Sequence, residues 1–176
     1  MATAKKKDAG GRVNPKPEPR RRKRKLKKRA YEFKLARVRE ACASWRIESP
    51  EEAYAYWNSA VATSAWYQEN KEHMVVLLLN TRHNIEGHSL VSIGTLNETL
   101  THPREILSPV ICGGAFGFIL MHNHPSPSPP DKRLTKRISE CARLLQVSFL
   151  DHVIAGREGA ADDGEPFFSF SAKGLL

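Results

Sequence analysis

Residues 116–131 read FGFILMHNHPSPSPPD, and this segment is the most informative one about the fold class. Its first part, Phe116–Met121, is short and apolar, which is typical of a strand buried on both faces. It runs directly into His122, and a Pro-rich loop follows. From Asp131 to Gln146 the apolar residues recur at helical spacing and predict an amphipathic helix. A buried strand followed closely by such a helix favours an α/β arrangement.

Strands and helices alternate along the rest of the chain. Ser49 and Glu52 can form a capping box around Pro50, which predicts a helix from residue 50 to about 63. Strands are expected at His73–Leu79, Glu86–Ile93, Val147–Ile154 and Phe167–Phe170, and a further helix from Thr101 to about Cys112. The buried face of the helix after Asp131 is expected to contain Leu134, Ile138, Cys141, Leu144 and Leu145. This interleaving predicts an α/β sandwich.

Positive charge is concentrated at the N-terminus. Residues 1–30 hold 14 of the 28 Lys and Arg residues but only two of the 19 acidic ones, so the remaining chain is net negative. Residues 1–30 also contain few large apolar side chains, so we expect a disordered basic tail. The block Arg20–Arg29 could contact nucleic acid through salt-sensitive phosphate contacts. A solubilising tail without a specific partner is the alternative interpretation.

Several classes of protein are excluded by composition. No apolar run is long enough for a transmembrane helix, and no apolar stretch follows Lys5–Lys7 as a secretory signal would require. The three cysteines form no C-x-x-C pair, which argues against a disulfide scaffold and a thiolate zinc site. We therefore expect a cytoplasmic protein without a membrane partner. Composition does not indicate an oligomeric state.

The residues after the buried strand have the chemistry of a metal site. Side chains at positions i and i+2 of a strand share a face, so His122 and His124 can present two imidazoles to one ion. Asp131 is a candidate third ligand, and two histidines with one carboxylate are typical of catalytic zinc. Asp131 also has a simpler interpretation as a capping acid in the first turn of a helix whose N-cap is Ser128.

These motifs resemble the JAMM signature of the MPN/JAB metallopeptidases, in which His-x-His-Pro precedes Ser-x-x-Asp. More narrowly, the segment from about Glu72 to Gly156 resembles the bacterial RadC-like proteins. The matching pieces are Glu72-His73, Leu78–Thr81, Ser92–Thr95, His102–Glu105, His122–Ser126 and Leu150–Ile154. The resemblance implies a three-layer sandwich with a mixed central sheet, similar to cytidine deaminases. It divides the chain into a tail (1–30), an N-terminal extension with one helix (31–66) and a RadC-like domain (67–176).

The resemblance also implies roles for individual residues. His122, His124 and Asp131 match the zinc ligands, Ser128 matches the serine that stabilises the oxyanion, and Glu72 matches the catalytic glutamate. Zinc would activate water for hydrolysis of a peptide or isopeptide-like amide in a peptide or protein substrate. From the residues alone, Glu72 is also readable as an exposed acid at the start of a strand. Glu105 is the other candidate glutamate, although it lies where an acid caps a helix.

The loop between the second histidine and the aspartate is shorter than in the family. Six residues, Pro125–Pro130, separate His124 from Asp131. Its prolines could hold the shorter loop in shape, or the shortening could move Asp131 and silence the site. The alternative function is a non-enzymatic, DNA-associated module of the repair type that binds through its basic tail. A zinc nucleobase deaminase is excluded, because that chemistry requires H-x-E with P-C-x-x-C.

Overall fold

A computed structural model describes residues 45–94, 102–123, 132–156 and 165–176. In chain order the elements are α1 (Pro50–Tyr56), the π-helical turn η1 (Trp57–Val61), β1 (Glu72–Leu79), β2 (Ile85–Gly94), α2 (Pro103–Gly113), β3 (Gly117–Asn123), α3 (Lys132–Leu145), β4 (Ser148–Ala155) and β5 (Phe167–Ser169). The helices and strands predicted within these ranges are confirmed.

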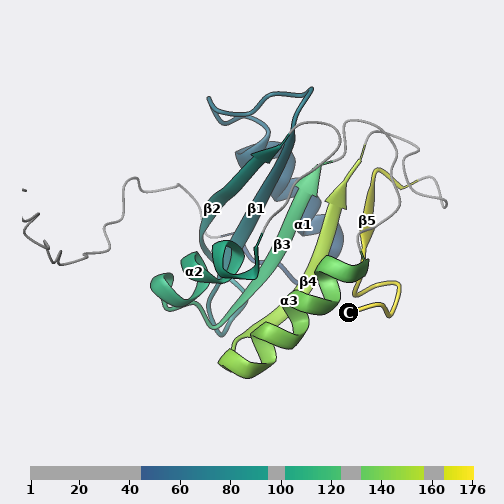
Figure 1. Cartoon of the computed structure of the whole chain (residues 1–176). Coiled ribbons are helices and arrows are strands. Elements are labelled where there is room, and N and C mark those ends of the chain that lie inside the picture. Colours follow the sequence, from purple (N-terminus) through teal and green to yellow (C-terminus); the bar gives the residue numbers. More distant parts are fainter. Residues whose placement is uncertain (1–44, 95–101, 124–131, 157–164) are drawn as a thin grey trace, which may run out of the picture. The chain divides into compact units, whose positions relative to one another are not determined.

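The five strands form one sheet in the order β2-β1-β3-β4-β5 (Figure 1). Strand β3 pairs antiparallel with β1 and parallel with β4, and the two outer pairs are antiparallel. A parallel pair needs a crossover connection, which here contains α3, the helix between β3 and β4 in the chain. The mixed central sheet expected from the sequence is therefore confirmed.

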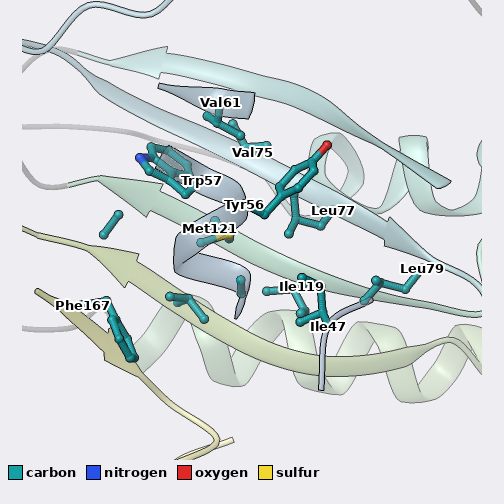
Figure 2. Close-up of a cluster of buried hydrophobic side chains, with 13 residues drawn as sticks. Ile47, Tyr56, Trp57, Val61, Val75, Leu77, Leu79, Ile119, Met121 and Phe167 are labelled. Carbon is teal, nitrogen blue, oxygen red and sulfur yellow. The ribbon is translucent and has the colours of Figure 1, made fainter. Parts of the chain in front are cut away.

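Helices cover both faces of the sheet (Figure 1). On the face that we call the α1 face, α1 and η1 pack on alternate strand residues, including Val75, Leu77, Ile119 and Met121 (Figure 2). On the α2–α3 face, the two longer helices pack on the intervening residues, including Met74, Val76, Phe118 and Leu120. Successive side chains of a strand point to opposite faces, so strands that are apolar throughout can join two cores. The three-layer sandwich is confirmed.

Helix α1 begins as its sequence predicts. The Ser49 hydroxyl accepts a hydrogen bond from the backbone N–H of Glu52 at 3.4 Å, and the Glu52 carboxylate accepts one from the N–H of Ser49 at 3.1 Å. Pro50 occupies the first helical position, where its missing N–H costs nothing. The chain continues as η1, which buries Trp57 and Val61 against the sheet.

The expected buried face of α3 is wrong at its C-terminal end. Ile138 is fully buried and Leu134 and Cys141 pack partly against the sheet, but Leu144 is 79% exposed and Leu145 is 47% exposed. At about 100° per residue, Leu144 lies roughly 120° from Ile138 around the helix axis, so it leaves the buried face. Leu145 points in nearly the same direction as Ile138, but it is the last residue of the helix.

Several predictions fall outside the described residues. The disordered tail is one of them, because residues 1–44 are not described. The division of the chain at residues 30 and 66 also stays a prediction. Within the described part, residues 45–66 contribute α1 and η1 to the core on the α1 face. No helix in the described ranges is long and apolar enough to cross a membrane.

Asp151 of β4 fastens the C-terminal turn to the sheet. Its Oδ1 accepts hydrogen bonds from the backbone N–H groups of His152 (2.7 Å) and Ser171 (2.9 Å), and its Oδ2 accepts one from the Ser169 hydroxyl at 2.6 Å. Burial raises the pKa of the Asp151 carboxyl above its ordinary value, and the hydrogen bonds from Ser169 and the backbone offset part of that rise. The folded protein therefore holds a proton on this group more tightly than the unfolded chain does.

This raised pKa makes one contribution to stability fall as pH increases. Above the ordinary value of about 4, the unfolded chain releases the Asp151 proton first, so the free energy of unfolding declines with pH up to the raised pKa. Asp151→Asn should remove this decline, because the amide keeps an oxygen for the two backbone N–H groups and does not titrate. Urea unfolding at a series of pH values measures the difference between the two proteins. Parallel pH profiles would contradict the assignment.

Candidate metal centre

His122 lies near the end of β3 and faces the α2–α3 side of the sheet. It pairs with Met74 of β1, and it shares the face of Phe118 and Leu120 because strand side chains alternate. The imidazole is 6% exposed. The strand thus delivers the first predicted ligand to the edge of a packed core.

A second imidazole meets His122 inside this core. His152 Nε2 lies 2.8 Å from His122 Nδ1, and His152 Nδ1 lies 2.7 Å from the Thr135 hydroxyl of α3. The ring of His152 is fully buried and stacks on Phe170, with centroids 4.9 Å apart and an angle of 12° between the planes. Because Nδ1 of His122 faces His152, any metal bound by His122 would be held through Nε2.

Glu72, the predicted catalytic glutamate, is the first residue of β1 and pairs with Gly94 of β2. It lies two positions before Met74 in the strand, so its side chain belongs to the α2–α3 face, as does that of His122. Diagonal neighbours of this kind lie about 7–8 Å apart across antiparallel strands. The fold therefore brings Glu72 and His122 to the same end and the same face of the sheet.

The side chain of Asn123 forms hydrogen bonds with the backbone on both sides of Glu72. Its Oδ1 accepts a hydrogen bond from the N–H of His73 at 2.8 Å, and its Nδ2 donates one to the carbonyl of Lys71, also at 2.8 Å. The side chain is 5% exposed, so these bonds are shielded from water. The middle residue of the His-x-His motif thus ties the strand of the histidines to the start of the strand that carries the glutamate.

His73 itself has a structural environment. Its ring stacks on Tyr67, Nδ1 lies 3.0 Å from the carbonyl of Lys71, and Nε2 accepts a hydrogen bond from the N–H of Gln68. It points to the α1 face, away from His122, because it is one residue from Glu72 in the strand. His73 therefore holds the chain before β1 in place and does not belong to the candidate centre.

Glu105, the other candidate glutamate, caps α2. Its carboxylate accepts a hydrogen bond from the backbone N–H of His102 at 3.3 Å, as expected for an acid in a first helical turn. It also lines a shallow groove of about 520 Å³ between β2 and α2, together with Ser89, Leu90, Val91, Arg104, Ser108 and Pro109. This capping role makes Glu105 the weaker candidate.

The other predicted site residues, His124, Ser128 and Asp131, lie outside the described residues. In the ranges that are described, no three His, Cys, Asp or Glu side chains come together as a metal site would require. The described part of the centre fits a metal through its chemistry: a buried imidazole whose second nitrogen faces a hydrogen-bonding partner is the usual state of a metal-binding histidine.

Three residues around this centre were absent from the predicted site: His152, Thr135 and Asn123. The sequence contained a partial signal for His152, because Leu150–Ile154 is one of the pieces that resemble the RadC-like proteins. Asp151 and His152 are adjacent on a strand, so only one of them can point to the face of His122. The structure turns His152 toward His122 and Asp151 toward the C-terminal turn. Nothing in the sequence pattern distinguishes Thr135 from an ordinary helical threonine.

Comparison with known proteins places the chain in a family. The model of the RadC-like JAB domain matches residues 47–175. A UPF0758 protein of Chlorobaculum parvum is 39% identical over 74% of this chain and 55% of its own length. A UPF0758 protein of Clostridium acetobutylicum is 36% identical over 82% of this chain and 59% of its own. The chain spans about half the length of the curated relatives it matches.

The family match covers every element described above, from the residues before α1 to the C-terminal turn. Its range includes Glu72, the His122–His152 pair and the sequence His-x-His-Pro with Ser-x-x-Asp. The JAB domain family is related to metallohydrolases, which agrees with the chemistry of these side chains. This chain belongs to the RadC-like JAB domain family.

Proposed function

We propose that this chain is a zinc-dependent hydrolase of the JAMM type that cleaves a peptide or isopeptide-like amide bond in a cytoplasmic peptide or protein. One observation carries the proposal: Glu72 and His122 share one end and one face of the sheet. A carboxylate that can move a proton therefore lies beside an imidazole that can hold a metal. The segment that follows β3 in the chain contains His124, Ser128 and Asp131.

His122, His124 and Asp131 would hold the zinc ion. Two neutral imidazoles and one carboxylate are a common catalytic ligand set, which leaves a position for water or substrate. When bound, zinc polarises the amide carbonyl of the substrate and lowers the pKa of a water molecule toward neutrality.

The residues of the chain would perform the proton transfers. Glu72 would accept a proton from the attacking water and return it to the leaving nitrogen, which cannot depart as an anion. The hydroxyl of Ser128 would donate a hydrogen bond to the oxygen that gains negative charge. Asn123 supports this step, because it fixes the backbone on both sides of Glu72.

Zinc content tests the ligand set. We expect about one zinc ion per chain after purification with zinc available, because three protein ligands hold catalytic zinc tightly. His124→Ala should lose nearly all of it, whereas His88→Gln, on the α1 face beside Tyr56, should keep it. Elemental analysis of the purified proteins measures the ratio. A wild-type protein without zinc under these conditions would contradict the proposal.

The proton-transfer role of Glu72 is tested by Glu72→Gln. The amide keeps the size of the side chain but cannot titrate, so hydrolysis of a responsive peptide from a fluorogenic amide library should fall by roughly 10²-fold or more. Zinc content should not change, because Glu72 is not a ligand.

Glu105→Gln is the matched control for this experiment. Its carboxylate caps α2, so the substitution should alter thermal stability slightly and leave the hydrolysis rate near that of the wild type. Loss of hydrolysis in Glu105→Gln alone would show that the other glutamate transfers the proton. Equal rates for wild type and Glu72→Gln would exclude the proposed role of Glu72.

The charge of the N-terminus favours a second candidate function, a DNA-associated role in which the basic tail binds nucleic acid. Replacing the Lys and Arg residues of Arg20–Arg29 by Gln should weaken binding to a DNA duplex and reduce the dependence of the affinity on salt concentration. With fewer phosphate contacts, binding releases fewer counterions from the DNA. Fluorescence anisotropy at several salt concentrations measures both quantities.

The matched control replaces the exposed basic residues of α3 by Gln, namely Lys132, Arg133, Lys136 and Arg137. We expect this variant to bind as the wild type does. If it loses binding while the tail variant keeps it, the nucleic-acid contact lies in the folded domain and the tail has no part in it.

A further inference from the structure

Three buried side chains from three different elements form a chain of two polar contacts that ends at His122, a proposed zinc ligand. Thr135 of α3 contacts Nδ1 of His152 on β4 at 2.7 Å, and Nε2 of His152 contacts Nδ1 of His122 on β3 at 2.8 Å. The three residues are 1%, 0% and 6% exposed, in that order. Water therefore has little access to these two contacts, so the position of each proton depends on the neighbouring side chains.

Only one proton fits between two imidazole nitrogens 2.8 Å apart. In the first arrangement, Thr135 donates to His152, and Nε2 of His152 donates to Nδ1 of His122. Neutral His122 then carries its proton on Nε2, which cannot bind a metal. In the second arrangement, Nδ1 of His122 donates to His152, and Nδ1 of His152 donates to Thr135. Nε2 of His122 then has a lone pair for a metal.

The position of Thr135 within a helix favours the second arrangement. A threonine within a helix commonly donates its hydroxyl proton to a backbone carbonyl one turn earlier, so its oxygen presents a lone pair to other groups. That lone pair can accept from Nδ1 of His152. In either arrangement the ring of His152 stacks on Phe170, which keeps it beside Thr135 and His122.

We propose that His152, supported by Thr135, is a positioning residue that fixes the Nδ1–H tautomer of His122 and directs its Nε2 toward the metal. The two residues touch neither substrate nor metal; they act through His122. The part of this inference that concerns the metal rests on the proposed zinc function. The tautomer itself is a property of the metal-free protein and can be measured without it.

The first measurement is the tautomer of His122 in the metal-free chain of residues 1–176, by ¹H–¹⁵N long-range NMR correlation of the imidazole nitrogens at neutral pH. We expect the Nδ1–H form in the wild type and in Thr135→Ser, which keeps the hydroxyl. Thr135→Val keeps the shape but removes the acceptor, so the Nε2–H form should become populated. An unchanged Nδ1–H form in both Thr135→Val and His152→Phe would overturn the proposal.

The second measurement is zinc affinity, by competition with a chromophoric chelator. Loss of a partner of a metal-binding histidine typically costs about 10–100-fold in affinity, and we expect a loss of this size in His152→Phe and the lower end of it in Thr135→Val. Thr135→Ser should restore wild-type affinity. His88→Gln is the matched control, because it removes a histidine–hydroxyl contact of 2.8 Å to Tyr56 on the opposite face. Thermal unfolding confirms that each variant is folded.

The outcomes separate the two proposals. Wild-type protein that binds no zinc, but shows a tautomer controlled by Thr135, would contradict the zinc function and support the positioning role. Wild-type protein that binds zinc with the same affinity as His152→Phe and Thr135→Val would support the zinc function and overturn the positioning role.

Discussion

Strand β3 is buried on both faces, and this burial governs how the other strands are arranged. All seven of its residues are buried, so its backbone groups have to find partners in other strands. They do so through β1 on one edge and β4 on the other. This central position explains why the end of β3 meets residues from both neighbours. His122 contacts His152 of β4, and Asn123 holds the start of β1.

Because strand side chains alternate, adjacent residues point to opposite faces and make different contacts. His122 faces α2 and α3 and contacts His152 on that side. Asn123, one residue later, bonds the backbone around Glu72. On β4 the same rule separates Asp151, which anchors the C-terminal turn, from His152, which faces His122. His122 and His152 are therefore each next to a residue whose side chain ties its own strand to a neighbouring segment.

Because these polar side chains are buried, each of them needs a hydrogen-bond partner. A buried polar group without a hydrogen-bond partner costs about 1–3 kcal/mol, so a half-satisfied network would weaken the fold. Among the described residues, no buried side-chain nitrogen or oxygen lacks a partner. Asp151, His152 and Thr135 thus add polar contacts to the core without leaving any of them unmatched. Such a network restrains the geometry of the site because each ring and carboxylate has few alternative positions.

Local patterns in the sequence determined much of this protein. Ser49 and Glu52 marked the start of α1, the apolar run before His122 marked β3, and the His-x-His-Pro and Ser-x-x-Asp motifs indicated the family. These features depend on residues close together in the chain, where helix capping and strand alternation act. Two residues of α3 were assigned wrongly to its buried face: Leu144 lies about 120° from Ile138 around the helix axis, and Leu145 is the last residue of the helix.

The contacts between residues of different strands could not be predicted from these local patterns. Glu72 and His122 are 50 positions apart, and the pairing of β1 with β3 brings them together. The contact between His122 and His152 depends on the parallel pairing of β3 with β4, and Thr135 reaches them because α3 crosses over that pair. Strand register and helix packing set these distances, and both result from burying the two hydrophobic clusters at once.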